Sequence, residues 1–174
     1  MAAASNFRCK AAICAALLGL CMAGCNAKEP AVVNGLTGIV YNYSQEGYVS
    51  IKINGKEVGT TARKVQLGDV SGGGGMCCFS LPLGAKEVEV ELEPSLSDGY
   101  KTTAKIEKWW PDLAHYGVVH ILPGRKVVMQ VTPSAPRPRK DLLEKRQEEL
   151  GLEKKVLFDY WSAGPIERID GKGK

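Results

Sequence analysis

Thiols are the side chains in this sequence that point most directly to chemistry. Of the six cysteines, three lie within the first 24 residues and Cys25 follows them, which leaves the adjacent pair Cys77 and Cys78 in the body of the chain. In an oxidising compartment such a pair tends to form a disulfide, while together with Met76 or a histidine it offers soft ligands for Cu(I) or Zn. Adjacent cysteines alternate faces in a regular strand, so a bond between them requires a turn or a distorted peptide. Without a second spaced pair the zinc signal is weak, and we expect a candidate disulfide and no metal.

Other catalytic groups are few. The two histidines are His115 and His120, and no serine stands in a G-x-S-x-G context. His120 lies within an apolar run, where a hydrogen-bonded structural histidine is more common than a general base. The net charge of +4, with both signs mixed along the chain, is not that of a nucleic-acid binder. We therefore expect no catalytic residues, no cofactor and no nucleic-acid partner.

The N-terminus has the pattern of a secretory signal. Arg8 and Lys10 are its only charged residues, and residues 11–23 are uncharged. That apolar run is shorter than the about 20 residues of a membrane span, so we expect residues 1–24 to be a removed signal peptide. The alternatives are a plain secreted protein cut nearby and a buried apolar helix.

The end of this signal resembles a bacterial lipobox. Ala23 and Gly24 directly precede Cys25, although Met22 stands where the motif prefers leucine. The resemblance implies that Cys25 carries a diacylglycerol and, after cleavage, an N-acyl chain. Residue 26 is asparagine and not aspartate, which under the usual sorting rule favours the periplasmic face of the outer membrane. Residues 25–34 would then form a short tether.

The pattern from residue 35 to residue 133 predicts an all-β domain. Alternating apolar and polar residues indicate strands at 48–53 and 86–93, and we expect a further short strand around 64–67. Asn54-Gly55 predicts a type I′ hairpin, and Pro123-Gly124-Arg125 a second one. About seven short strands without helical crossovers favour an antiparallel β-sandwich or a barrel, and we expect the sandwich.

Two features of this domain are candidate contact points. The glycine run lacks the Gly-Lys-Ser/Thr of a phosphate loop, so we interpret it as a bulge or a close backbone approach at a sheet edge. Adjacent tryptophans in a strand point to opposite faces, so one can enter the core while an outward one could anchor a partner; the alternative is edge packing by both rings. The residues concerned are Gly72, Gly73, Gly74, Gly75, Trp109 and Trp110.

Residues 134–174 form a Pro/Arg linker, a charged helix and a tail in this interpretation. Asp141 with Glu144 three residues later predicts a capping box for a helix that ends near Leu150. The apolar stripe of this helix is thin, so it either packs at the edge of the domain or stands in solvent. We expect the β-domain to survive deletion of everything after Arg139.

Four segments together resemble the bacterial lipoprotein family catalogued as domain of unknown function 3304: residues 38–41, 48–55, 71–82 and 120–133. The similarity covers about residues 35–133. It implies a non-enzymatic envelope lipoprotein encoded near type VI secretion lipase effectors, hence an immunity protein that binds and neutralises such a phospholipase in the periplasm. The alternatives are a structural or assembly lipoprotein with a resident partner, and a thiol-based metal or redox sensor at Cys77 and Cys78.

Overall fold

The computed structural model describes residues 31–154, 162, 164–170 and 172. The predicted signal peptide, Cys25 and most of the predicted tether lie outside these residues. Ala31–Lys174 forms one compact unit. Among the described residues, no helix is both long enough and apolar enough to cross a bilayer.

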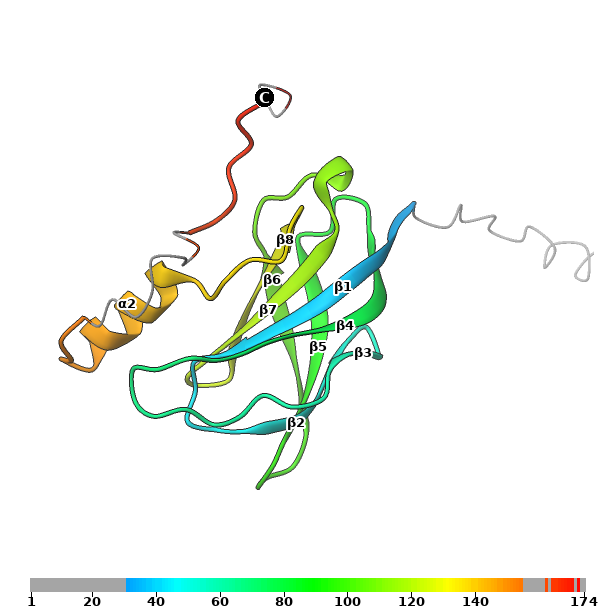
Figure 1. Cartoon of the computed structure of the whole chain (residues 1–174). Coiled ribbons are helices and arrows are strands. Elements are labelled where there is room, and N and C mark those ends of the chain that lie inside the picture. The colour runs from blue at the N-terminus through cyan, green and yellow to red at the C-terminus, as the bar shows by residue number, and fades with distance from the viewer. Residues whose placement is uncertain (1–30, 155–161, 163, 171, 173–174) are drawn as a thin grey trace, which may run out of the picture. The chain divides into compact units, whose positions relative to one another are not determined.

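Eight strands make up a single sheet. They are β1 (Val32–Asn42), β2 (Tyr48–Ile53), β3 (Lys56–Gly59), β4 (Ser71–Pro82), β5 (Glu87–Pro94), β6 (Tyr100–Ile106), β7 (Tyr116–Leu122) and β8 (Lys126–Thr132). Their order is β3-β2-β5-β6-β8-β7-β1-β4, and the sheet curls until it nearly closes into a barrel (Figure 1). The expected all-β class is confirmed. The finer expectation of a sandwich is not confirmed, because hydrogen bonds join all eight strands.

Both predicted hairpins are present. Asn54 and Gly55 have φ angles of 48° and 76°, the positive values that a type I′ turn between β2 and β3 requires. Gly124 and Arg125 are also in the left-handed region and connect β7 to β8. The strand expected around residues 64–67 is wrong, since this segment is irregular between the bridge at Ala62 and β4. The last three residues of the predicted tether also pair in the sheet, because β1 begins at Val32.

The interior of the curled sheet is filled by side chains. Val88, Val90 and Leu92 alternate inward along β5, as the sequence pattern predicts. A Cβ added to Gly117 would overlap the ring of Phe79 and would lie 2.7 Å from the Cε of Met129. The centre therefore has no room even for a methyl group at this point.

A second apolar cluster lies on the outer face of β1 and β7. Ile39, Tyr41, Tyr43 and Val118 point away from the interior because they alternate with the inward residues of their strands. Leu143 of helix α2 (Lys140–Glu149) is buried among them. The C-terminal segment therefore supplies part of the core, and the expectation that it is dispensable is not supported by this packing.

The start of helix α2 differs from the predicted capping box. The residue before the helix is Arg139, and no side chain caps the helix N-terminus. Asp141 instead binds the guanidinium of Arg139, and Glu144 faces Lys140 at 3.7 Å. Arg139 competes successfully for the carboxylate because its side chain, only 2% exposed, needs a counter-charge.

Candidate functional site

The glycine run occupies one edge of the sheet. Strand β4 pairs with β1 on one side only, and its other side lies beside β3, with no ladder between them in the described chain. Glycines 72–75 are all exposed. Gly72, Gly74 and Gly75 border a groove of about 120 Å³ at the seam between β3 and β4. Its lining consists of Val40, Gly59, Thr60, Thr61, Gly72, Gly74, Gly75 and Met76.

Two of these glycines are required by the backbone. Gly72 and Gly73 have φ angles of 120° and 104°, and a Cβ on Gly72 would overlap the carbonyl oxygen of Val40. The register between β1 and β4 shifts at this place, between Ile39 and Tyr41. The interpretation of the run as an irregular, closely approached sheet edge is thus confirmed.

Gly74 has no such structural requirement. Its φ is not in the left-handed region, and a Cβ there would meet nothing within 4 Å. The space beside this residue is open, so the backbone of β4 is accessible from outside at Gly74. Position 74 is therefore the place where the glycine edge can be altered without disturbing the fold.

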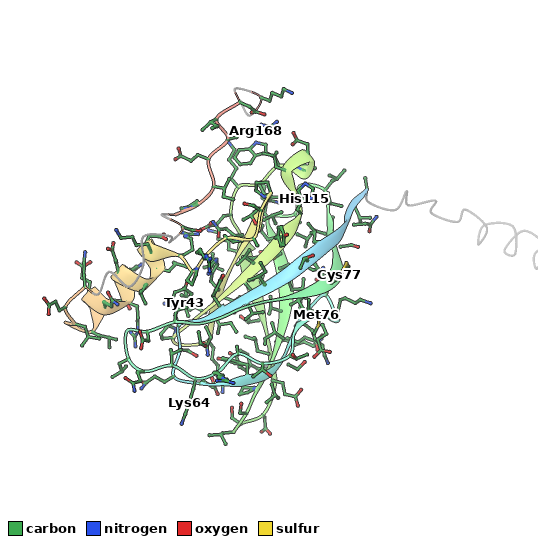
Figure 2. All side chains as sticks on the ribbon, in the orientation of Figure 1. Tyr43, Lys64, Met76, Cys77, His115 and Arg168 are labelled. Carbon is green, nitrogen blue, oxygen red and sulfur yellow. A yellow bond between two sulfur atoms is a disulfide. The ribbon has the colours of Figure 1, made fainter. Side chains whose placement is uncertain are left out.

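Cys77 and Cys78 follow the glycine run directly and are joined to each other in the structure. The peptide bond between them is cis. Cys77 is exposed on the same strand as Met76 (Figure 2), while Cys78 is half-buried. Within the described residues no three histidine, cysteine or carboxylate side chains gather as a metal site would require.

The tryptophans do not lie in a strand, so the expectation of opposite strand faces is wrong. They precede the short 3₁₀ turn η2 (Pro111–Leu113), and both are half-buried. Trp109 packs against the interior and donates a 2.8 Å hydrogen bond from Nε1 to the Ala85 carbonyl. The ring of Trp110 has Lys108 Nζ 5.4 Å from its centroid and the Arg168 guanidinium at 5.9 Å.

The structure does not bring the tryptophans to the glycine run. The glycines belong to the first half of β4, whereas Ala85, which holds Trp109, follows the last residue of that strand. Arg168 also binds both carboxylate oxygens of Asp112, at 2.9 and 2.7 Å. The C-terminal segment thus partly covers Trp110, which leaves the glycine edge as the more open of the two candidate contact points.

A buried polar network lies between β1, β7, β8 and the C-terminal segment. His120 Nδ1 is 3.3 Å from the Tyr43 hydroxyl, and His120 Nε2 is 3.2 Å from Gln130 Oε1. The backbone N–H of Arg139 donates to the Tyr43 hydroxyl at 2.8 Å. The Tyr43 proton is then directed at His120 Nδ1, which makes His120 a neutral imidazole protonated at Nε2.

This network is structural. Burial lowers the pKa of His120 to about 4, so the ring is neutral near neutral pH, as expected for a structural histidine. Burial also raises the pKa of Tyr43 well above its usual range. Neither group can exchange protons with a substrate, because both are almost fully covered. The sequence could not reveal the network, since Tyr43, His120, Gln130 and Arg139 share no local pattern.

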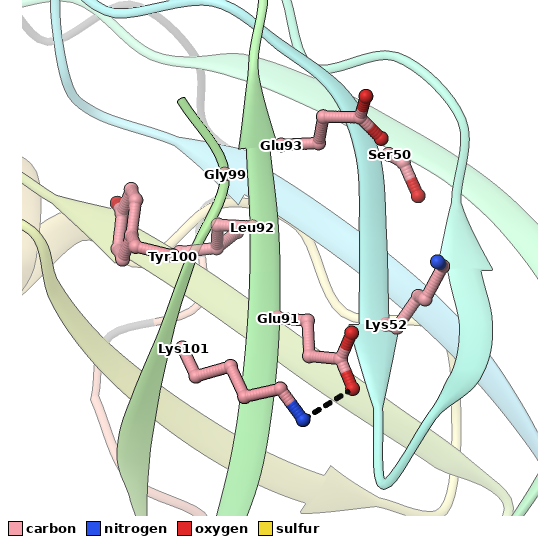
Figure 3. Close-up of a pocket in the computed structure, with 8 residues that line it drawn as sticks. All are labelled: Ser50, Lys52, Glu91, Leu92, Glu93, Gly99, Tyr100 and Lys101. Atoms are coloured by element: carbon pink, nitrogen blue, oxygen red, sulfur yellow. Dashed lines mark ion pairs between the residues drawn. The ribbon is translucent and has the colours of Figure 1, made fainter. Parts of the chain in front are cut away.

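A second hollow lies on the outer face of β2, β5 and β6 (Figure 3). It measures about 320 Å³, and its charged lining carries both signs: Lys52, Glu91, Glu93 and Lys101. Lys101 Nζ lies 2.9 Å from Glu89 and 3.1 Å from Glu91. These are solvent-exposed ion pairs across neighbouring strands, and such pairs contribute little to the free energy of folding. Their side chains do not converge on a point where a substrate could bind.

Comparison of this chain with protein-family models, with curated proteins and with solved structures finds no match. The family resemblance drawn from residues 35–133 therefore stays a prediction.

Proposed function

We propose that this chain is a non-enzymatic lipoprotein of the bacterial envelope that binds and neutralises a secreted phospholipase effector in the periplasm. The observation that carries the binding role is the open edge of β4, where four glycines are exposed and three of them, Gly72, Gly74 and Gly75, border the seam groove. The immunity role and the effector come from the resemblance of the sequence to envelope lipoproteins encoded beside lipases.

An open edge suits protein binding. Edge strands present unpaired N–H and C=O groups, and a partner segment can add to them as a further strand. Side chains usually protect such an edge, but residues 72–75 have none. Gly74 has nothing within 4 Å of where a side chain would begin. A partner's backbone or an inserted side chain can therefore approach β4 closely here.

The proposed anchor would concentrate inhibitor and target in the same layer. A lipase acts at the membrane, so holding its inhibitor on that membrane raises the effective concentration of each for the other. Each buried methylene contributes about 0.8 kcal/mol, so several acyl chains on Cys25 would hold the protein firmly where one chain would exchange.

Replacing Cys25 with serine is expected to release the protein from membranes without changing its fold. The variant loses the acyl chains, while the described strands of the body begin only at Val32. The measurement is flotation of cell envelopes, with far-ultraviolet circular dichroism as the check on folding. Continued flotation of Cys25→Ser with membranes would remove the anchor from this proposal.

Gly74→Lys is expected to weaken binding to the lipase encoded by an adjacent gene by at least about tenfold, which corresponds to 1.4 kcal/mol. A lysine on the open edge blocks strand addition. Gly164→Lys is the matched control, because its added side chain also meets nothing within 4 Å but lies in the C-terminal segment. Affinity measured by titration of the purified pair should fall for Gly74→Lys alone. Equal affinities for both variants would show that the β4 edge is not the binding surface.

Two alternatives stay open as proposals. A structural or assembly lipoprotein would use the same edge for a resident envelope protein, and co-purification without any lipase would favour it. A redox sensor would use the exposed Cys77 next to the groove, and a change in partner binding after reduction would favour that function.

For the fold itself, we propose a sandwich-like packing of the two halves of the curled sheet. Residues of β5 and β6 on one side and of β1, β4 and β7 on the other meet in one interior cluster. This arrangement leaves the seam between β3 and β4 as the open side.

A further inference from the structure

We propose that one rim of the domain rests on the bilayer surface, and that it sets the orientation of the protein on the membrane. This inference rests on the lipid anchor of the proposed function. The rim consists of Val32, Leu83, Lys86, Lys108 and Trp110, the residues around the start of β1. The surface that this rim contacts is a lipid bilayer with anionic headgroups.

Backbone contacts hold the parts of this rim together. The start of β1 meets the turn after β4, since Val32 pairs with Pro82 and the Leu83 N–H donates to the Ala31 carbonyl at 2.8 Å. The same turn receives the indole N–H of Trp109 at its Ala85 carbonyl. Figure 1 shows the start of β1 and the turn η2 at the same end of the sheet.

The composition of the rim fits a membrane surface. Val32 and Leu83 are 45% and 48% exposed, so both present apolar surface to their surroundings. Lys86 is exposed, and Lys108 extends over the ring of Trp110. Aliphatic side chains, a tryptophan and lysines are the types that settle at the headgroup level. The neighbouring acids Asp112 and Asp170 share the single guanidinium of Arg168.

The length of the proposed tether selects this rim over other exposed apolar sites. Five residues lie between Cys25 and Ala31, and the six steps of backbone from one to the other can span at most roughly 20 Å. The start of β1 therefore cannot leave the vicinity of the bilayer. Leu96 is 94% exposed, but it lies in the turn between β5 and β6, at the end of β5 that is opposite to Lys86 of the rim. The patch is too small to bind lipid alone, so it orients a body that the acyl chains already hold.

This orientation places the glycine edge above the membrane. Strand β4 ends at Pro82 in the rim, and its glycines lie seven to ten residues earlier. At about 3.3 Å per residue, and less where the strand is irregular, the edge would stand roughly 20–30 Å from the headgroups. A partner bound at the glycine edge would therefore be held about one domain height above the headgroups.

The test uses the lipidated protein reconstituted into vesicles of phosphatidylethanolamine and phosphatidylglycerol, with and without bromine on the acyl chains. A Trp161→Phe variant leaves Trp109 and Trp110 as the emitting residues. We expect brominated lipid to cause a loss of their emission. Adding Val32→Glu and Leu83→Glu should abolish that loss, whereas the control Leu96→Glu should leave it unchanged. Flotation and circular dichroism accompany every variant.

The outcomes separate the rim from the anchor. If the protein floats but brominated lipid leaves its emission unchanged, the rim proposal is overturned and the anchor stands. If Leu96→Glu reverses the quenching as fully as the rim variants do, the orientation is wrong. If the lipidated wild-type chain does not float at all, the anchor fails, and the rim proposal fails with it.

Discussion

Gly72→Ala is expected to lower the free energy of unfolding by roughly 2–5 kcal/mol, which combines backbone strain with overpacking. The φ of Gly72 is 120°, a conformation that alanine rarely adopts, and its new Cβ would overlap the carbonyl oxygen of Val40. That oxygen belongs to the backbone of β1 and cannot rotate away as a side chain could. Relief requires a local shift of β4 from β1.

Gly74→Ala is the matched control for this prediction. It adds the same methyl group two residues away, at an ordinary φ and with nothing within 4 Å. Its stability should differ from that of the wild type by less than about 0.5 kcal/mol, as for other surface substitutions. Urea denaturation followed by circular dichroism measures both variants. Equal stabilities would mean that the close approach between β4 and β1 does not constrain the glycine run.

Acid is expected to destabilise the protein through His120. Its folded pKa is about 4 against an ordinary value of 6.5, because burial disfavours the charged ring. The unfolded chain therefore binds a proton first as the pH falls. Stability is complete above pH 6.5 and decreases down to about pH 4, by roughly 3 kcal/mol at 1.36 kcal/mol per pKa unit.

The environment of His120 opposes a second proton on the ring, although the hydrogen bond between Nε2 and Gln130 favours the charged form. Nδ1 accepts from Tyr43, so a second proton there breaks the existing hydrogen bond. The Arg139 guanidinium also disfavours a positive ring, while Asp141 partly offsets it. Arg139 itself is neutralised by Glu107 at 2.7 Å and by Asp141. Protonation of His120 should therefore weaken the contact between the C-terminal segment and the sheet.

Unfolding by urea between pH 7 and pH 4 measures this effect, with His120→Gln as the comparison. The variant is less stable overall, but its stability should change much less between pH 6.5 and 4. The pKa values of Asp112 and Asp170 are lowered by hydrogen bonds to Arg168. Their contribution is lost only as the pH falls below their usual range, so the two effects occupy different pH windows. A wild-type protein as stable at pH 4.5 as at pH 7 would contradict the assignment.

Local features of the fold were accessible from the sequence. The alternation of valines and glutamates in residues 87–93 determines which face of β5 is buried, because side chains alternate in a strand. Asn54-Gly55 determines a hairpin, since few other pairs tolerate two positive φ values. The same reasoning failed at residues 64–67, which form an irregular loop with Leu67 51% exposed, and at Asp141, which binds the buried Arg139 instead of capping the helix.

The sequence by itself therefore determined the all-β class, both hairpins, the irregular glycine edge and the structural character of His120. These depend on one residue and its immediate neighbours. Only the tertiary structure decided that the strands join in one curled sheet, that the tryptophans lie apart from the glycines, and that the C-terminal segment completes a second apolar cluster. Such outcomes depend on contacts between distant segments, as between Tyr43 and Arg139, 96 residues apart. No local pattern encodes which distant partner will satisfy a buried polar group.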